Sequence, residues 1–169
     1  MLTDKFGHGR GIRTGKAPND DVSTPPKIAR MIVERFPIEG KTLDPFRGNG
    51  AFYDCLPGKR DWCEIKEDRD FFEWKERVDW IVSNPPYSTF DQVLAHSFEV
   101  ADNVLYLLPL SKVVSSMRRI RAIEDYGGVK EVFILSASKC GFPFGFPACA
   151  IWFKRGYKGE TKISIDKKA

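Results

Sequence analysis

Helical and strand-like patterns alternate along nearly the whole chain, and this alternation limits the fold more than any other feature of the sequence. Apolar residues recur at helical spacing in three segments, at 24–36, 89–101 and 112–126. Short runs rich in Val, Ile, Leu and aromatic residues predict strands at 41–46, 60–65, 78–86, 103–110, 129–137 and 148–154. Strands that alternate with helices predict an α/β protein whose mainly parallel sheet has helices on both faces.

The domain organisation is predicted to be simple. The chain of 169 residues is long enough to bury a core without metals or disulfides. We interpret 1–20 as a flexible basic arm and 21–169 as a single domain, because the sequence contains no linker and no internal repeat. Glycines separate the basic residues of the arm, which favours mobility and contact with a polyanion. These basic residues are Lys5, Arg10, Arg13 and Lys16.

Composition disfavours several classes of protein. No apolar stretch approaches the roughly 20 residues of a membrane span, and the N-terminus lacks the apolar core of a signal peptide. The sequence therefore predicts a cytoplasmic protein with no membrane partner. Its four cysteines form no C-x-x-C pair and its two histidines lie far apart, so we expect reduced thiols and no metal site.

A first motif follows the predicted strand that begins at residue 41, at a position where α/β proteins bind ligands. In "DPFRGNG", residues 44–50, the glycines allow close approach of the backbone and Asp44 offers a carboxylate. A dinucleotide fingerprint would need a further glycine where Tyr53 stands. Glu64 ends the next predicted strand and can accept hydrogen bonds from both hydroxyls of a ribose. The two carboxylates predict a nucleoside cofactor without a pyrophosphate.

A second motif, "SNPPYS" at residues 83–88, directly follows another apolar strand. Alone, it is also compatible with a strand-ending turn that carries an aromatic plug. Together with "DPFRGNG" it resembles the S-adenosylmethionine-dependent adenine-N6 DNA methyltransferases, in particular the small adenine methylases often carried by phages. The resemblance covers the chain from "STPP" at residue 23 to "IWFKRGY", which ends at residue 157.

The resemblance implies a fold, a cofactor and a set of site residues. The implied fold is the three-layer, Rossmann-like class I methyltransferase fold with a C-terminal antiparallel hairpin, and the implied cofactor is S-adenosylmethionine. The implied catalytic residues are Asn84, Pro85, Pro86 and Tyr87. The implied cofactor contacts are Thr24, Pro25, Asp44, Phe46, Gly48, Gly50, Glu64, Asp70 and Phe71.

The chemistry of an amino group agrees with this implied role. The lone pair of an adenine amino nitrogen is delocalised into the ring, which makes the nitrogen a poor nucleophile. The Asn84 side-chain oxygen and the Pro85 carbonyl can each accept one amino hydrogen, which localises the lone pair and stabilises the developing charge. The prolines restrict the turn that holds these acceptors. Tyr87 can stack on a base that has left the helix.

The sequence departs from the family pattern in two places. The family usually has a helix and a strand between the ribose carboxylate and the adenine-contacting acid, whereas only "IKEDR" separates Glu64 from Asp70. We therefore expect one of the usual seven strands to be reduced or missing. There is also no segment for a separate target-recognition domain. We expect nucleic-acid contacts from the basic arm, from the helical residues Arg118, Arg119 and Arg121, and from Lys139 in the loop "KCGFPFGFP".

Several interpretations remain open at the level of sequence. The basic residues also fit a solvated surface. The favoured substrate is adenine in duplex DNA, with the target base flipped out, but RNA adenine and a protein glutamine are alternatives for the same tetrapeptide. A non-catalytic nucleic-acid-binding subunit of the same fold is an alternative from another class. The sequence predicts neither a recognition site nor an oligomeric state.

Overall fold

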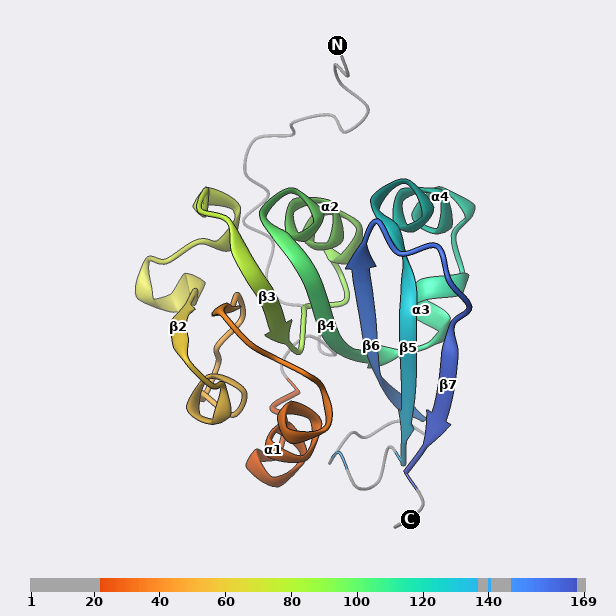
Figure 1. The fold of residues 1–169 in the computed structure, drawn as a ribbon. Helices are drawn as coiled ribbons and strands as arrows, with labels where there is room; N and C mark the ends of the chain where they lie inside the picture. The colour runs from red at the N-terminus through yellow and green to blue at the C-terminus, as the bar shows by residue number, and fades with distance from the viewer. Residues whose placement is uncertain (1–21, 137–139, 141–146, 167–169) are drawn as a thin grey trace.

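A seven-stranded sheet with the strand order β2-β1-β3-β4-β6-β5-β7 forms the centre of the molecule (Figure 1). The computed structural model describes residues 22–136, 140 and 147–166. Strands β2, β1, β3 and β4 run parallel to one another, whereas β6 is antiparallel to both β4 and β5. The strands are β1 Lys41–Asp44, β2 Lys59–Trp62, β3 Val78–Ser83, β4 Ala101–Pro109, β5 Gly127–Leu135, β6 Ala148–Arg155 and β7 Lys162–Ile165. The predicted C-terminal antiparallel hairpin is confirmed as β5 and β6.

Helices cover both faces of the sheet, as the alternation of patterns predicts. One face packs against α1 and the segment around Phe52, and the other against α2, α3 and α4. The helices are α1 Pro26–Arg35, α2 Phe90–Val100, α3 Ser111–Val114 and α4 Met117–Tyr126, with short 3-10 helices η1 Tyr53–Cys55, η2 Ile65–Glu67 and η3 Phe71–Glu73. The three-layer α/β architecture predicted from the sequence is therefore confirmed.

The apolar spacing of each element determines which face it buries. In α1, Pro26 occupies the first turn, where its missing N–H costs nothing, and Ile28, Ile32 and Val33 form the buried stripe. Strand β3 contributes to both layers, because Trp80 and Val82 belong to the core on the α1 side and Ile81 to the core on the α2 side. A strand buried on both faces accounts for the continuous apolar run in the sequence.

The expectation of one basic helix over 112–126 is wrong, because the structure contains two helices there. Ser116 has an extended backbone, with φ −141° and ψ 118°, and its hydroxyl accepts a hydrogen bond from the Arg119 backbone N–H at 3.4 Å. It is thus the N-cap of α4, and its extended backbone separates α3 from α4. A serine can cap a helix or lie within one, so apolar periodicity alone does not reveal the break.

The strand expected to be reduced or missing is absent from the predicted place. Between Glu64 and Asp70 the chain forms η2 and an isolated bridge that joins Glu64 to Arg69. The seventh strand comes instead from the opposite edge of the sheet, where β7 pairs in parallel with β5. Strand β7, which is four residues long and mostly exposed, is not among the strands predicted from the sequence.

Some predicted features lie outside the described residues. These are the basic arm, with Lys5, Arg10, Arg13 and Lys16, and Lys139 of the aromatic loop. For the part of the chain that is described, no helix has both the length and the apolar character needed to cross a membrane.

Candidate functional site

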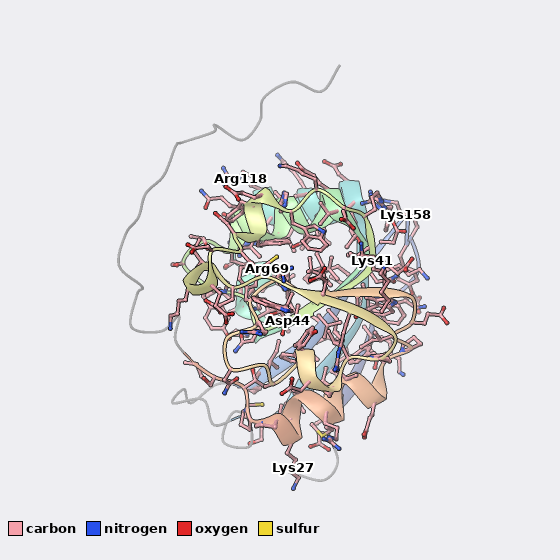
Figure 2. All side chains as sticks on the ribbon, turned by 90° about the vertical axis from the view of Figure 1, so that its left-hand side faces the viewer. Lys27, Lys41, Asp44, Arg69, Arg118 and Lys158 are labelled. Carbon is pink, nitrogen blue, oxygen red and sulfur yellow. The ribbon has the colours of Figure 1, made fainter. Side chains whose placement is uncertain are left out.

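The carboxyl ends of β1 and β3 meet around a buried carboxylate, Asp44, which is 1% exposed. Figure 2 labels Asp44 near the middle of the view, and Lys27 and Lys158 at the edge of the molecule. One Asp44 oxygen accepts hydrogen bonds from the Ser83 hydroxyl at 2.6 Å and from the Phe46 backbone N–H at 3.3 Å. The other accepts from the Tyr53 backbone N–H at 3.2 Å. Asp44 thereby ties the glycine loop to the end of β3.

Burial has a large effect on the ionisation of Asp44. Loss of hydration raises its pKa to about 6, although the hydrogen bonds from Ser83, Phe46 and Tyr53 favour the charged form and oppose the shift. The carboxylate is thus ionised at neutral pH mainly because three donors surround it. Ser83 is the first residue of the "SNPPYS" motif, and its contact with Asp44 was not predicted from the sequence.

The loop of the first motif folds over a second carboxylate, that of Glu64. Gly48 and Gly50 have positive φ angles of +52° and +89°, which glycine adopts without strain. The Gly48 backbone N–H donates to one Glu64 oxygen at 2.9 Å, and the Lys66 backbone N–H donates to the other at 3.1 Å. The structure therefore brings the predicted cofactor residues Gly48 and Glu64 into direct contact across the ends of β1 and β2.

The amide of Asn84 is held by the segment that precedes α1. Its side-chain nitrogen donates to the Val22 carbonyl at 3.0 Å and to the Thr24 hydroxyl oxygen at 3.3 Å. Because a carbonyl only accepts hydrogen bonds, the contact with Val22 identifies the nitrogen and leaves the Asn84 oxygen on the other side of the amide. Thr24, a predicted cofactor residue, is buried and thus lies beside the predicted catalytic residue.

The rest of the tetrapeptide forms the turn between β3 and α2. Pro85 is buried, and Pro86 and Tyr87 are half-buried. The Tyr87 ring packs against the core on the α2 side of the sheet. The Nζ atom of Lys112, on α3, lies 5.6 Å from the centre of this ring. Sequence reasoning missed Lys112, because only the fold brings α3 next to the turn.

Three further predicted cofactor residues have local structural contacts. The Asp70 carboxylate accepts from the Phe72 backbone N–H at 2.9 Å and caps η3. The Phe71 ring is 2% exposed and packs edge-on against Phe46, with 5.4 Å between ring centres. Pro25 precedes α1, and its carbonyl accepts the first hydrogen bonds of the helix. The cofactor roles of these residues stay predictions, and the buried Phe71 ring presents no open face.

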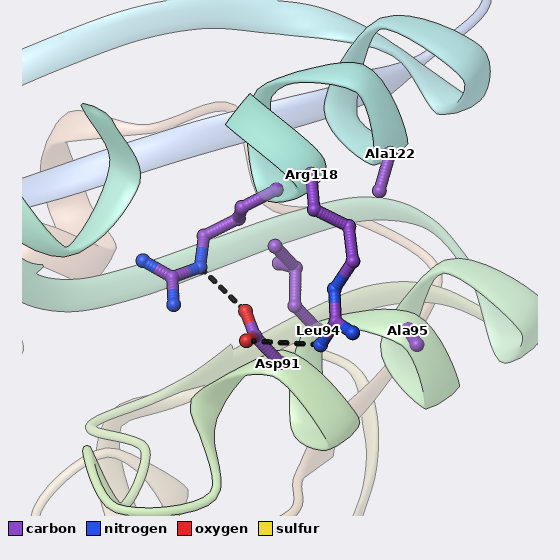
Figure 3. A pocket seen from close by; sticks show the side chains of 6 residues that line it. Asp91, Leu94, Ala95, Arg118 and Ala122 are labelled. Carbon is purple, nitrogen blue, oxygen red and sulfur yellow. Dashed lines mark hydrogen bonds and ion pairs between the residues drawn. The ribbon is translucent and has the colours of Figure 1, made fainter. Parts of the chain in front are cut away.

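Two of the predicted nucleic-acid residues pair with a carboxylate on α2 (Figure 3). Arg119 Nε donates to Asp91 at 2.7 Å, and an Arg118 terminal nitrogen donates to the other Asp91 oxygen at 3.3 Å. Burial opposes ionisation of Asp91, but these arginines outweigh it and its pKa lies below the usual value. The Arg119 side chain is only 12% exposed, whereas that of Arg118 is 66% exposed. Arg121 is exposed as well.

The cavity beside these arginines is too small for a substrate. It measures about 20 Å³ and is lined by Asp91, Leu94, Ala95, Arg118, Arg119 and Ala122. This volume is close to that of a single water-sized probe. Elsewhere in the described part of the chain, His, Cys, Asp and Glu form no cluster that could hold a metal ion.

Comparison with solved structures decides the fold. The chain superposes with a TM-score of 0.67 on a proposed class I S-adenosylmethionine-dependent methyltransferase from Listeria monocytogenes, over 92% of this chain and 68% of that one, at 12% identity. The chain has the class I methyltransferase fold. No protein-family model matches the sequence, and no curated protein does either.

Other proteins with this methyltransferase fold include enzymes of nucleic-acid modification. The methyltransferase subunit of a type I restriction-modification system from Streptococcus thermophilus has a TM-score of 0.60 and 13% identity, over 82% of this chain and 46% of that subunit. A proposed RNA methyltransferase from Pyrococcus horikoshii has a TM-score of 0.52 and 15% identity, over 76% of this chain and 81% of that protein. This chain thus spans less than half of the restriction-modification subunit.

Proposed function

We propose that this protein transfers a methyl group from S-adenosylmethionine to the N6 amino group of adenine in DNA. The observation that carries the proposal is the orientation of the Asn84 amide, whose nitrogen is bound by Val22 and Thr24. This arrangement leaves the amide oxygen as a hydrogen-bond acceptor at the end of β3, one residue from the carboxylate-anchored Ser83. An acceptor held in place before the substrate arrives needs no reorganisation during the reaction.

The residues at the ends of β1 and β2 fit the proposed cofactor. The Glu64 carboxylate accepts two backbone N–H groups, and a carboxylate has about four lone-pair sites, so two hydroxyls of a ribose can still be accommodated. A Cβ atom at Gly48 would meet nothing closer than the Phe46 carbonyl at 3.9 Å, so the backbone there is open to a ligand. When bound, S-adenosylmethionine supplies an electrophilic methyl group.

The protein's own groups act on the adenine amino group. The Asn84 side-chain oxygen and the Pro85 carbonyl each accept a hydrogen bond from one N–H of this group, and these bonds draw the nitrogen toward tetrahedral geometry. Methylation would leave the amino nitrogen positively charged, and water can take its extra proton, so no general base with a shifted pKa is required. Asp44 does not take part in this proton transfer in our proposal, because its three hydrogen bonds are all to the protein. Asp44 holds the glycine loop against β3, and its predicted contact with the cofactor stays a prediction.

The choice of DNA rests on indirect support. The related fold of the restriction-modification subunit favours DNA, and the fold of the Pyrococcus protein leaves RNA as an alternative substrate for the same chemistry. The exposed Arg118 pairs with Asp91, four residues after Tyr87, and Arg121 is exposed on the same helix, so α4 provides positive surface charge. The net charge of +4 is compatible with a polyanionic substrate.

A methyl-transfer assay tests the proposal directly. Purified protein and S-adenosylmethionine with a labelled methyl group are incubated with duplex DNA, single-stranded DNA, RNA and protein in parallel reactions. We expect label in DNA, recovered as N6-methyladenine after digestion to nucleosides. Label in RNA or protein alone would identify another substrate, and label in none of them, in a protein that binds the cofactor, would favour a non-catalytic subunit. An Asn84→Ala variant is the matched control for contaminating activity.

A further inference from the structure

We propose that Lys112 binds a phosphate next to the adenine that is methylated, and that Asp91 and Arg119 position Lys112 for this task. The inference rests on the proposed function, which it extends from the reacting base to the substrate backbone. The contacts that carry it, here called the circuit, join Lys112 to the Tyr87 ring and, through Arg119, to Asp91, which follows Tyr87 by four residues in the chain.

The first part of the circuit is the contact between Lys112 and the aromatic ring. Lys112 lies on α3, which begins two residues after the end of β4, and its Nζ atom is 5.6 Å from the centre of the Tyr87 ring. Within residues 22–136, 140 and 147–166, no carboxylate forms an ion pair with Lys112. Its charge is therefore not neutralised by the described part of the chain, although it lies beside a residue proposed to stack on the substrate base.

The second part of the circuit fixes the backbone that carries Lys112. A terminal nitrogen of Arg119 donates to the Lys112 carbonyl, while the Nε atom of the same side chain donates to Asp91 at 2.7 Å. Asp91 lies in the first turn of α2, four residues after Tyr87 (Figure 3). Arg119 thus joins the start of α3 to the start of α2, and its guanidinium also lies 5.2 Å from the centre of the Phe90 ring.

The burial of Arg119 distinguishes this role from that of a surface arginine. Its side chain is 12% exposed, and each of its polar contacts is made within the protein, whereas Arg118 on the same helix is 66% exposed. Five fixed donors and a planar geometry suit the guanidinium to hold two elements at once. A phosphate would have to compete with Asp91 for Arg119, whereas Lys112 has no carboxylate partner among the described residues, so we assign the phosphate beside the reacting base to Lys112.

The chemistry of the expected ligand follows from the position of Lys112. A base that stacks on Tyr87 remains attached to a sugar with phosphates on either side. A lysine ammonium is a compact charge on a flexible stem and binds such phosphates without requiring a planar partner. Contact with one phosphate would contribute to affinity for any sequence and would release about one counterion equivalent from DNA.

The test compares Lys112→Gln with Lys112→Arg, and uses Lys59→Gln as a matched control. Lys59 is an exposed lysine at the amino end of β2, away from the ends of the strands that form the site. On the DNA substrate that the parent methylates, we expect Lys112→Gln to raise KM about tenfold with little change in kcat. It should also reduce the slope of log KM against log salt by about one, and Lys112→Arg should restore both.

A chemical change in the substrate identifies the group that Lys112 binds. In a duplex with neutral methylphosphonates on both sides of the methylated adenine, the parent should lose as much affinity as Lys112→Gln, and the substitution should have no further effect. Additive losses would overturn the phosphate assignment. A Lys112→Gln variant with the parental KM and the parental salt slope would also overturn it. A variant that loses both thermal stability and activity, but keeps the parental slope of log KM against log salt, would show that Lys112 only packs on Tyr87.

The positioning role of Arg119 has its own test. Arg119→Lys keeps the charge but replaces the planar guanidinium, whose separate nitrogens bind Asp91 and the Lys112 carbonyl, with a single ammonium group. It should raise KM as Lys112→Gln does, and the double variant should be no worse than either single variant. Independent, additive effects would show that Arg119 does not act through Lys112. A parent that methylates no DNA at all would instead refute the proposed function, and thus differs from each of these outcomes.

Discussion

The hydrogen bond from Ser83 to Asp44 leads to a prediction whose size depends on pH. The bond is 2.6 Å long, both residues are buried, and the acceptor carries a charge at neutral pH. Hydrogen bonds to charged groups contribute about 1.5–3 kcal/mol to stability, and those between neutral groups about 0.5–1.5 kcal/mol. Ser83→Ala should therefore lower the free energy of unfolding by about 2 kcal/mol above pH 7.

The direction of the pH effect follows from the raised pKa of Asp44. Because that pKa is about 6 in the folded protein, against an ordinary value of 3.8, Asp44 destabilises the fold progressively as the pH rises from about 4 to 6. Ser83→Ala removes a donor that favours the charged form, so it should raise the pKa of Asp44 further and extend the loss of stability to higher pH. At pH 5, where Asp44 is mainly protonated, the loss caused by the substitution should shrink to about 1 kcal/mol.

Urea unfolding of parent and variant at pH 5 and pH 8 measures this difference. Thr42→Val is the matched control, because Thr42 lies on the same strand as Asp44, is fully buried, and has a hydroxyl with no hydrogen-bond partner among the described residues. It should cause no loss of stability at either pH. An equal loss for Ser83→Ala at both pH values would refute the argument that the hydroxyl serves mainly to stabilise the charged carboxylate.

Three further predictions concern activity and binding. Asn84→Ala should slow single-turnover methylation about 100-fold and leave the cofactor affinity measured by calorimetry unchanged. If the variant methylates at the parental rate, residues 84–87 form only a structural turn. Glu64→Ala should weaken S-adenosylmethionine binding at least tenfold by calorimetry, and unchanged affinity would remove the ribose assignment. Replacing Arg118 and Arg121 together by Gln should reduce the slope of log DNA affinity against log salt by up to about two. A variant with the parental slope would show that both arginines are solvated surface residues that do not contact phosphates.

Sequence patterns predicted those elements whose own apolar pattern matches their burial in the folded protein. Strands β3, β4 and β6 are continuous apolar runs because they are buried on both faces, and α1 has a buried stripe after a helix-starting proline. The predicted positions of Asp44 and Asn84 at the ends of β1 and β3 follow from the same strand boundaries. Both motifs could be placed at the site because parallel strands bring their carboxyl ends to one edge.

The features that sequence patterns missed depend on contacts between distant segments. Strand β7 has only four residues and its two isoleucines, Ile163 and Ile165, are exposed, so it has no buried apolar run; it pairs with the edge strand β5. The pairing of Arg119 with Asp91 joins two helices that periodicity describes separately. A run of arginines on a predicted helix is equally compatible with a nucleic-acid surface and with a structural brace. Burial distinguishes the two interpretations, and burial was not available from the sequence.

The contact between Asn84 and the segment before α1 means that the domain can be folded without having its Asn84 amide correctly oriented. The Val22 carbonyl and the Thr24 hydroxyl are 62 and 60 positions away from Asn84 in the chain, and both precede the first helix. Neither residue belongs to a helix or strand, and Val22 packs only at the margin of the core on the α1 side. Local unfolding of these few residues would therefore release the Asn84 amide while the strands of the sheet stay paired. Molecules in this state would be folded by any global measure and yet unable to orient an amino group. The fraction of molecules with a correctly oriented Asn84 amide would then depend on how tightly this short segment binds to the rest of the domain.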